Sequence, residues 1–184
     1  MTAPQAASDL LAFWFAESNR PFWFEKDPDF DAACRAAAEA LHRQAAAGAL
    51  EHWRESALGS LALLILLDQV PRNLYRGEAR AFATEAKARA VARAALDRGF
   101  DQGLSEEQRL FFYLPFEHSE DLADQRRSVA LFGQLTGRPD WLPWAERHAE
   151  IIARFGRFPH RNAALGRATT PEEAEFLAGP NSSF

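Results

Sequence analysis

Three short segments of the chain concentrate side chains that can bind ligands or transfer protons. The first begins at Asp68, directly after the longest apolar run, residues 61–67. Asp68 stands at helical spacings from apolar residues of that run, so we expect it to face the core. A buried carboxylate needs a partner, which Arg72 can supply. The pair would be either a structural ion pair or part of a site, whose candidate ligand-binding residues are Asp68, Gln69, Arg72 and Asn73.

The second segment, residues 117–124, holds four acidic residues and one histidine. A histidine beside a carboxylate can titrate near neutral pH and serve as a general acid or base, which makes Glu117 and His118 candidate catalytic residues. A structural histidine is the alternative. Glu120 and Asp121 have a simpler explanation, because acids in the first turn of a helix complement its dipole.

The third segment, residues 151–171, contains four arginines and no acidic residue. Within it, the irregular stretch after Gly156 is the kind of loop from which side chains reach ligands. Guanidinium groups suit carboxylate and phosphate, so these arginines either bind an external anion or neutralise the acids of the other two segments. The candidate ligand-binding residues here are Arg157, His160, Arg161 and Asn162, and His160 is also a third candidate catalytic residue.

Two neighbours of the third segment have structural interpretations. His148 falls on an apolar helical stripe, which predicts a core histidine bonded to the backbone or to a carboxylate. Arg154 is expected to pair with Glu150 at the i,i+4 spacing of a helix.

The elements that must position these segments all read as helices. Apolar residues recur every three or four positions, and no stretch alternates with a period of two, so the protein is predicted to be all-α. Helix starts are indicated at Asp27, Thr84, Ser105 and Thr170. Pro71 is expected to end or sharply bend its helix, and Pro115 to cause a kink or an early end. The predicted helices span about 8–17, 28–47, 56–70, 84–98, 105–115, 120–135, 139–155 and a short stretch from 171.

The length and composition fit one folded domain, residues 1–184, with a net charge of −5 and 47% hydrophobic residues. Helices of this length with short connections pack as antiparallel hairpins, either in a bundle or as a right-handed stack of pairs. The single Cys34 is interpreted as a core thiol, which favours a reducing, cytoplasmic setting. The apolar run is too short to span a membrane, and the acidic charge argues against nucleic-acid binding. No motif indicates a metal or a cofactor.

The three segments also carry longer motifs: Leu67-Asp-Gln-Val-Pro-Arg-Asn73, Pro115-Phe-Glu-His-Ser-Glu120 and Phe155-Gly-Arg-Phe-Pro-His-Arg-Asn162. With Trp14-Phe15, Trp23-Phe24, Leu165-Gly-Arg167 and the closing Ser-Ser-Phe184, they cover almost the whole chain. The chain resembles the bacterial domain-of-unknown-function family 924. The resemblance implies a tetratricopeptide-like stack of helical hairpins and supplies no reaction. The polar residues that it marks as characteristic are Asp68, Gln69, Arg72, Asn73, Glu117, His118, Arg157, His160, Arg161 and Asn162.

Three functions follow as hypotheses. In the leading one, the three polar segments meet in one groove and bind a small anionic ligand or an acidic peptide terminus through Arg72, Arg157 and Arg161. The first alternative is a hydrolase of an anionic substrate that uses Glu117 with His118, or His160, as acid and base. The second is a tetratricopeptide-like adaptor that binds a partner protein. The sequence leaves the ligand and the oligomeric state open.

Overall fold

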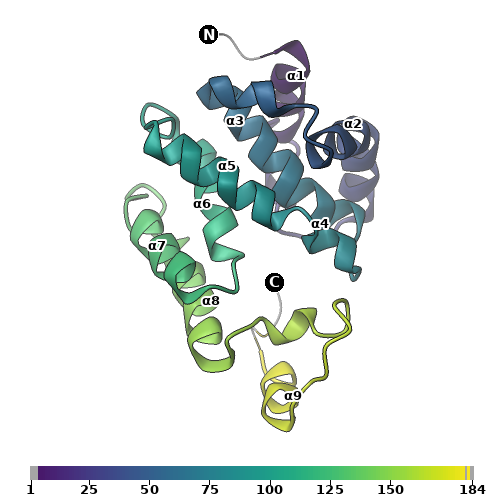
Figure 1. Ribbon diagram of the computed structural model, residues 1–184, viewed down its shortest axis with the longest axis vertical. Coiled ribbons are helices and arrows are strands. Elements are labelled where there is room, and N and C mark those ends of the chain that lie inside the picture. Colours follow the sequence, from purple (N-terminus) through teal and green to yellow (C-terminus); the bar gives the residue numbers. More distant parts are fainter. Residues whose placement is uncertain (1–3, 181, 183–184) are drawn as a thin grey trace. The chain divides into compact units, whose positions relative to one another are not determined.

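The computed structural model describes residues 4–180 and 182, and this part of the chain is helical and contains no strand (Figure 1). The all-α prediction is therefore confirmed. In the closing Ser-Ser-Phe184 motif, residues 183 and 184 lie outside the described residues. The helices are α1 (Gln5–Trp14), α2 (Pro28–Ala46), α3 (Ala57–Leu64), α4 (Val70–Leu74), α5 (Glu85–Asp97), α6 (Glu106–Glu117), α7 (Leu122–Phe132), α8 (Leu142–Phe155) and α9 (Pro171–Leu177).

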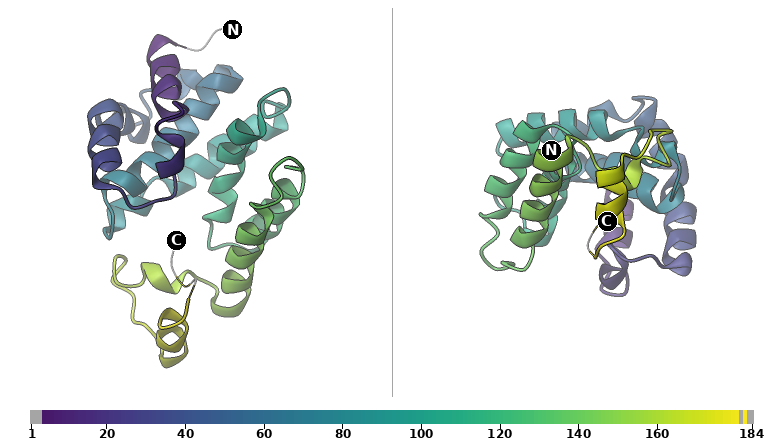
Figure 2. Two further views of the ribbon diagram at one scale, coloured as in Figure 1. Left: turned by 180° about the vertical axis from the view of Figure 1, so that it is seen from behind. Right: turned by 90° about the horizontal axis from the view of Figure 1, so that it is seen from below.

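The chain forms two compact units, each with its own set of helices. The first unit contains residues 4–76 and 80–115, and the second contains residues 77–79 together with 116 onward. In the first unit α3 packs against α1 and α5, while α2 packs against α4. In the second unit α7 and α8 lie side by side as a helical hairpin (Figure 2). The prediction of one domain and the tetratricopeptide-like order of the hairpins stay predictions.

Most of the helix starts read from the sequence are formed by the expected side chains. The Asp27 carboxylate accepts the N–H of Phe30, and Pro28 is the first residue of α2. Ser105 and Gln108 exchange hydrogen bonds before α6, and Thr170 forms a capping box with Glu173 at α9. These caps depend on residues three positions apart, which is why local sequence predicts them.

The core of the first unit is built around α3 and a group of aromatic rings. The residues of the apolar run 61–67 are buried. The Trp14 ring, fully buried, meets the ring of Phe111 edge to face at a centroid distance of 5.7 Å. Cys34 is also fully buried, and desolvation raises the pKa of its thiol to about 12, so it is a core thiol as predicted.

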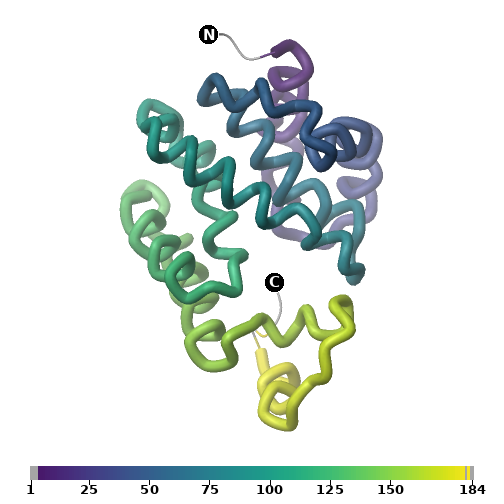
Figure 3. The backbone as a smooth tube through the Cα atoms, viewed as in Figure 1, coloured from purple at the N-terminus to yellow at the C-terminus, as the bar shows by residue number. Residues whose placement is uncertain are grey.

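The helix that begins at α3 does not end at Pro71, so of the two predicted outcomes only a sharp bend stays a prediction. It continues through a π turn, Ile65–Gln69, into α4, and the backbone trace runs through this region without interruption (Figure 3). The Val70 N–H reaches back five residues to the Ile65 carbonyl, and Pro71 has no N–H to donate. The carbonyls of Leu66 and Leu67 therefore accept hydrogen bonds from elsewhere in the unit.

Two side chains supply those hydrogen bonds. His42 Nδ1 lies 2.8 Å from the Leu66 oxygen and must carry the proton, because a carbonyl only accepts. The Thr84 hydroxyl donates to the Leu67 oxygen at 2.5 Å. Thr84 stands at the N-cap position of α5, as predicted, but its side chain makes no capping hydrogen bond there. Tertiary contacts thus replace the backbone bonds that the π turn and the proline remove.

At the other proline, α6 passes through Pro115 and ends two residues later at Glu117. The amide of Gln125, fully buried in α7, donates to the carbonyls of Glu117 and Ser119, both at 2.6 Å. This side chain satisfies the end of α6 and fixes where the second polar segment starts.

None of the helices in residues 4–180 combines the length and the apolar character needed to cross a bilayer.

Candidate functional site

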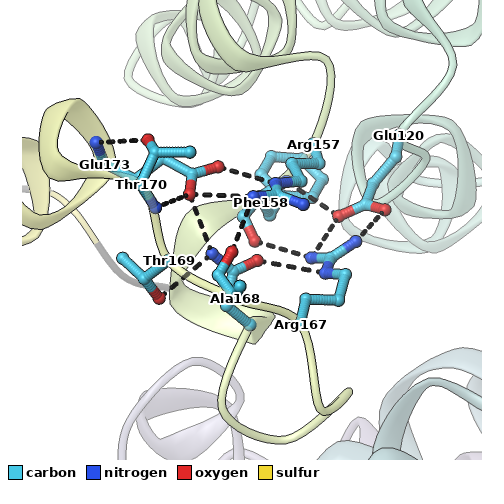
Figure 4. Close-up of polar contacts among 9 residues, drawn as sticks. Glu120, Arg157, Phe158, Arg167, Ala168, Thr169, Thr170 and Glu173 are labelled. Atoms are coloured by element: carbon cyan, nitrogen blue, oxygen red, sulfur yellow. Dashed lines mark hydrogen bonds and ion pairs between the residues drawn. The ribbon is translucent and has the colours of Figure 1, made fainter.

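The second unit brings the second and third polar segments together. The Glu120 carboxylate accepts both terminal nitrogens of Arg167, at 2.7 and 2.9 Å, and the backbone N–H of Phe158 at 2.7 Å (Figure 4). Burial acts to raise the pKa of Glu120, but these hydrogen bonds outweigh it and hold the pKa below its ordinary value. Glu120 therefore has a structural role: it fastens the loop after α8 to the end of α6.

A second ion pair fastens the same loop to α9. Arg157 donates two hydrogen bonds to the Glu173 carboxylate, at 2.6 and 2.9 Å, and one to the Ala168 carbonyl at 2.9 Å (Figure 4). The Asn162 amide donates to the same carboxylate at 3.1 Å. Hydrogen bonds from Arg157 and from the Thr170 N–H lower the pKa of Glu173 to about 2. Arg157 and Asn162, two of the predicted ligand-binding residues, are thus hydrogen-bonded within the protein.

The two ion pairs are connected to each other, because Arg167 Nε donates to Asn162 Oδ1 at 3.0 Å. The predicted partner of Arg154 is wrong: its guanidinium pairs with Glu172 at 2.9 Å, while Glu150 pairs with Arg147. The contact with Glu172 joins α8 to the following helix, which the i,i+4 rule does not consider.

Beside this network lies a group that we call the histidine cluster: Glu117, His118, His148, His160 and Arg161. Its centre is the fully buried ring of Phe158. The guanidinium carbon of Arg161 lies 4.5 Å from the centroid of this ring, and the rings of His148 and His160 lie 5.5 and 5.6 Å from it. Arg161, 3% exposed, donates to the His118 carbonyl at 3.0 Å. The cluster therefore combines a buried cation with three imidazoles.

His148 has the buried surroundings that its apolar stripe predicted. Its Nδ1 lies 2.8 Å from the Trp144 carbonyl, so this nitrogen carries the proton and Nε2 is the acceptor in the neutral ring. Burial, opposed by that hydrogen bond and reinforced by the charges of His118, Arg161 and His160, lowers the pKa of His148 to about 3. His148 is neutral at pH 7.

Glu117, the first residue of the second segment, lies close to the His148 ring. Glu117, 3% exposed, places Oε1 3.5 Å from His148 Nδ1, and the ring of His118 lies 6.3 Å from that of His148. In this geometry Glu117 lies beside His148, 31 positions along the chain, whereas the sequence reasoning considered only the adjacent His118. Sequence reasoning placed His148 in the core and left it out of the site, since nothing local links it to Glu117.

The candidate residues of the first segment lie in the first unit, on and after the π turn. Asp68, 1% exposed, accepts the Gln69 amide at 2.6 Å, and Arg72 Nη2 lies 3.9 Å from it. The predicted Asp68–Arg72 contact is present, but Arg72 is bonded more closely to the Glu85 carboxylate. These contacts favour the structural interpretation of Arg72.

Asn73, the last candidate of this segment, donates to Asp31 at 2.9 Å, and Arg76 joins the same carboxylate at 2.6 Å. Because this segment belongs to the first unit and the other two to the second, a groove shared by all three stays a prediction. Across the described residues, no set of three or more His, Cys, Asp or Glu side chains is arranged to hold a metal ion.

Comparison with known families shows the family to which the chain belongs. The family model for a bacterial protein of unknown function, DUF924, matches residues 10–181. The chain belongs to this family. A solved protein of unknown function from Agrobacterium tumefaciens, ATU0120, is similar to this DUF924 chain at a TM-score of 0.88 and 47% sequence identity, covering 93% of this chain and 96% of that one. A comparison with curated proteins gives no match. The family resemblance is confirmed, and neither description names a reaction.

Proposed function

We propose that this DUF924 protein binds a small carboxylate or phosphate anion at the histidine cluster of its second unit. The observation that carries the proposal is the placement of Arg161, whose buried guanidinium lies on the Phe158 ring among three imidazoles. Guanidinium and imidazole N–H groups are hydrogen-bond donors, which suits Arg161, His118 and His160 to an oxyanion, whereas the N–H of His148 is taken by the Trp144 carbonyl.

The ion pairs around the cluster support this proposal because they hold the loop that carries Arg161. Arg157 and Arg167 each make two hydrogen bonds to one glutamate, so the loop that carries His160 and Arg161 is held without help from a ligand. A loop fixed in advance loses less conformational entropy when it binds a ligand. The network therefore acts as the support of the site, and the anion contacts come from Arg161 and the histidines.

Hydrolysis of an anionic substrate is the second candidate, and the contact between Glu117 and His148 favours it. The Trp144 carbonyl at Nδ1 fixes the tautomer of His148 and leaves Nε2 as the acceptor, which is the orientation of a general base. The low pKa of His148 makes it a weak base, so His118 or His160 would carry the proton transfer and His148 would position them. The adaptor function and the cytoplasmic location rest on the sequence arguments alone.

Proton NMR of the histidine rings tests anion binding directly. The chain has five histidines, of which His42 and His52 belong to the first unit and provide an internal control. We expect the ring C–H signals of His118 and His160 to shift in a saturable way when acetate, phosphate or sulfate is added, while the exposed His52 does not. Equal shifts of His52, or no saturable shift with any anion, would overturn the proposal.

A pair of arginine variants localises the binding. Arg161→Lys keeps the positive charge but loses the planar fork, so the saturable shifts should weaken by about tenfold or more. Arg126→Lys, at an exposed position of α7, is the matched control and should bind like the parent. The ring signal of His148, buried in the second unit, reports whether each variant is folded there. Unchanged affinity in a folded Arg161→Lys protein would place the anion elsewhere.

A further inference from the structure

The turn that joins α6 to α7, residues 117–121, carries the backbone carbonyl to which Arg161 donates, and a side chain of α7 holds this turn. We infer that Gln125 is a positioning residue of the anion site, because it fixes the turn against which Arg161 is placed. The inference rests on the proposed function. It adds a residue that lies outside the three polar motifs of the sequence.

The Gln125 side chain holds the turn at two points. Its amide nitrogen donates to the carbonyls of Glu117 and Ser119, both at 2.6 Å. These two carbonyls flank that of His118, which accepts a hydrogen bond from the Arg161 guanidinium at 3.0 Å. One amide and one guanidinium thus bind three consecutive carbonyls, so a shift of the turn moves the group to which Arg161 is bonded.

The second described contact of Arg161 also leads back to this turn. Its guanidinium carbon lies 4.5 Å from the centroid of the Phe158 ring. The backbone N–H of Phe158 donates at 2.7 Å to Glu120, which belongs to the same turn. Both contacts of Arg161 therefore depend on where the turn lies, and Gln125 is the α7 side chain that binds its carbonyls.

A primary amide suits this position better than other side chains do. Carbonyl oxygens only accept, so both protons of the Gln125 nitrogen are used. A hydroxyl has only one proton to donate, and a lysine would place a charge where the side chain is fully buried. Gln125 Oε1 is buried and has no hydrogen-bond partner among the described residues, whereas an apolar side chain would remove both hydrogen bonds to the turn.

NMR of the arginine side chains tests the positioning step without an anion. Gln125→Met keeps the approximate length of the side chain but has no proton to donate. We expect the Arg161 Nε–H signal to shift in this variant and to stay unchanged in the matched control Ser128→Ala. Ser128 is fully buried about one turn further along α7, and its hydroxyl has no partner among the described residues. An unchanged Arg161 signal in folded Gln125→Met protein would overturn the inference.

A double-mutant cycle connects this position to binding. The probe is phosphate, or acetate where phosphate does not bind, and affinity is measured by isothermal titration calorimetry. A positioning residue acts through Arg161, whereas a general loosening of the fold weakens binding whatever stands at position 161. We expect Gln125→Met to weaken binding by about tenfold, and to cause no further loss when Arg161→Lys is already present. Losses that add in the double variant would overturn the inference.

The possible results separate the inference from the proposed function. Absence of saturable binding of acetate, phosphate and sulfate by the parent would overturn the proposed function, whatever the Arg161 signal does in Gln125→Met. Binding by the parent that Gln125→Met leaves unchanged would overturn the inference alone. If Gln125→Met does not fold, Gln125→Asn replaces it, because this variant keeps the amide but is one methylene too short to reach both carbonyls. Parent-like affinity of Gln125→Asn would then overturn the inference.

Discussion

The hydroxyl of Thr84 is expected to stabilise the first unit by donating a hydrogen bond to the Leu67 carbonyl, since Pro71 has no N–H to donate. Thr84→Val replaces that hydroxyl with a methyl group of similar size and leaves the Leu67 oxygen without its 2.5 Å hydrogen bond. A buried acceptor left without a donor costs about 1–3 kcal/mol. The added methyl group recovers part of this, about 0.8 kcal/mol per buried carbon. We therefore expect a net loss of about 0.2–2 kcal/mol in the free energy of unfolding.

Urea unfolding followed by circular dichroism measures this loss. With a slope m of about 2 kcal/mol per molar urea, the midpoint of Thr84→Val should fall by about 0.1–1 M at unchanged m. Thr84→Ser keeps the hydroxyl and is the matched control, with a smaller loss. In the Pro71→Ala background the new backbone N–H can serve the Leu67 carbonyl, so the cost of Thr84→Val should shrink.

Thr84→Asp decides between two roles of this side chain. An aspartate is a good N-cap, so a capping role would make the variant as stable as the parent. The observed geometry predicts the opposite, because a carboxylate can only accept and would face the Leu67 oxygen. A stable Thr84→Asp protein, or a loss for Thr84→Val that is the same with and without Pro71, would refute the reasoning.

Three further predictions address other contacts. Gly59→Ala would place a Cβ 2.1 Å from the Trp53 carbonyl oxygen. Although alanine normally favours a helix, we expect the free energy of unfolding to fall by about 1–3 kcal/mol or more, as measured by thermal unfolding. A variant as stable as the parent would contradict this close approach. The pKa of Glu173 in the folded protein is about 2, below its ordinary value of 4.5. Its contribution to stability is therefore present above about pH 4.5 and is lost as the pH falls toward 2. When unfolding midpoints are compared across pH, Glu173→Gln should lack this part of the acid dependence. Arg157→Lys keeps the positive charge but loses the two-point contact with Glu173, so the backbone amides of residues 158–170 should exchange hydrogen faster. Unchanged protection of these amides, measured by mass spectrometry, would count against a role of this ion pair in holding the loop.

Local sequence was sufficient for the features that depend on residues three or four positions apart. The caps at Asp27, Ser105 and Thr170 form as expected because each joins a side chain to a backbone or side-chain group within the same turn. The burial of Asp68 and His148 followed from helical spacing in the same way.

Pro71 shows where a local rule is incomplete. A proline removes one backbone hydrogen bond, and the rule that it ends a helix assumes that nothing else fills the place. At Pro71 two distant side chains, His42 and Thr84, fill it, and the helix continues through a π turn. The sequence contains both residues but does not show that they meet there.

The sequence by itself determined the all-α class, most helix starts, the membership in DUF924 and the three segments that hold the polar residues. Only the tertiary structure decided which charges meet. Glu120 and Arg167 are 47 positions apart, and Arg157 and Glu173 are 16 apart, so no helical period relates them. The packing of the helices determines such ion pairs, because it decides which charged side chains are buried next to each other. Packing placed Arg161 on the Phe158 ring and paired Arg157 with Glu173.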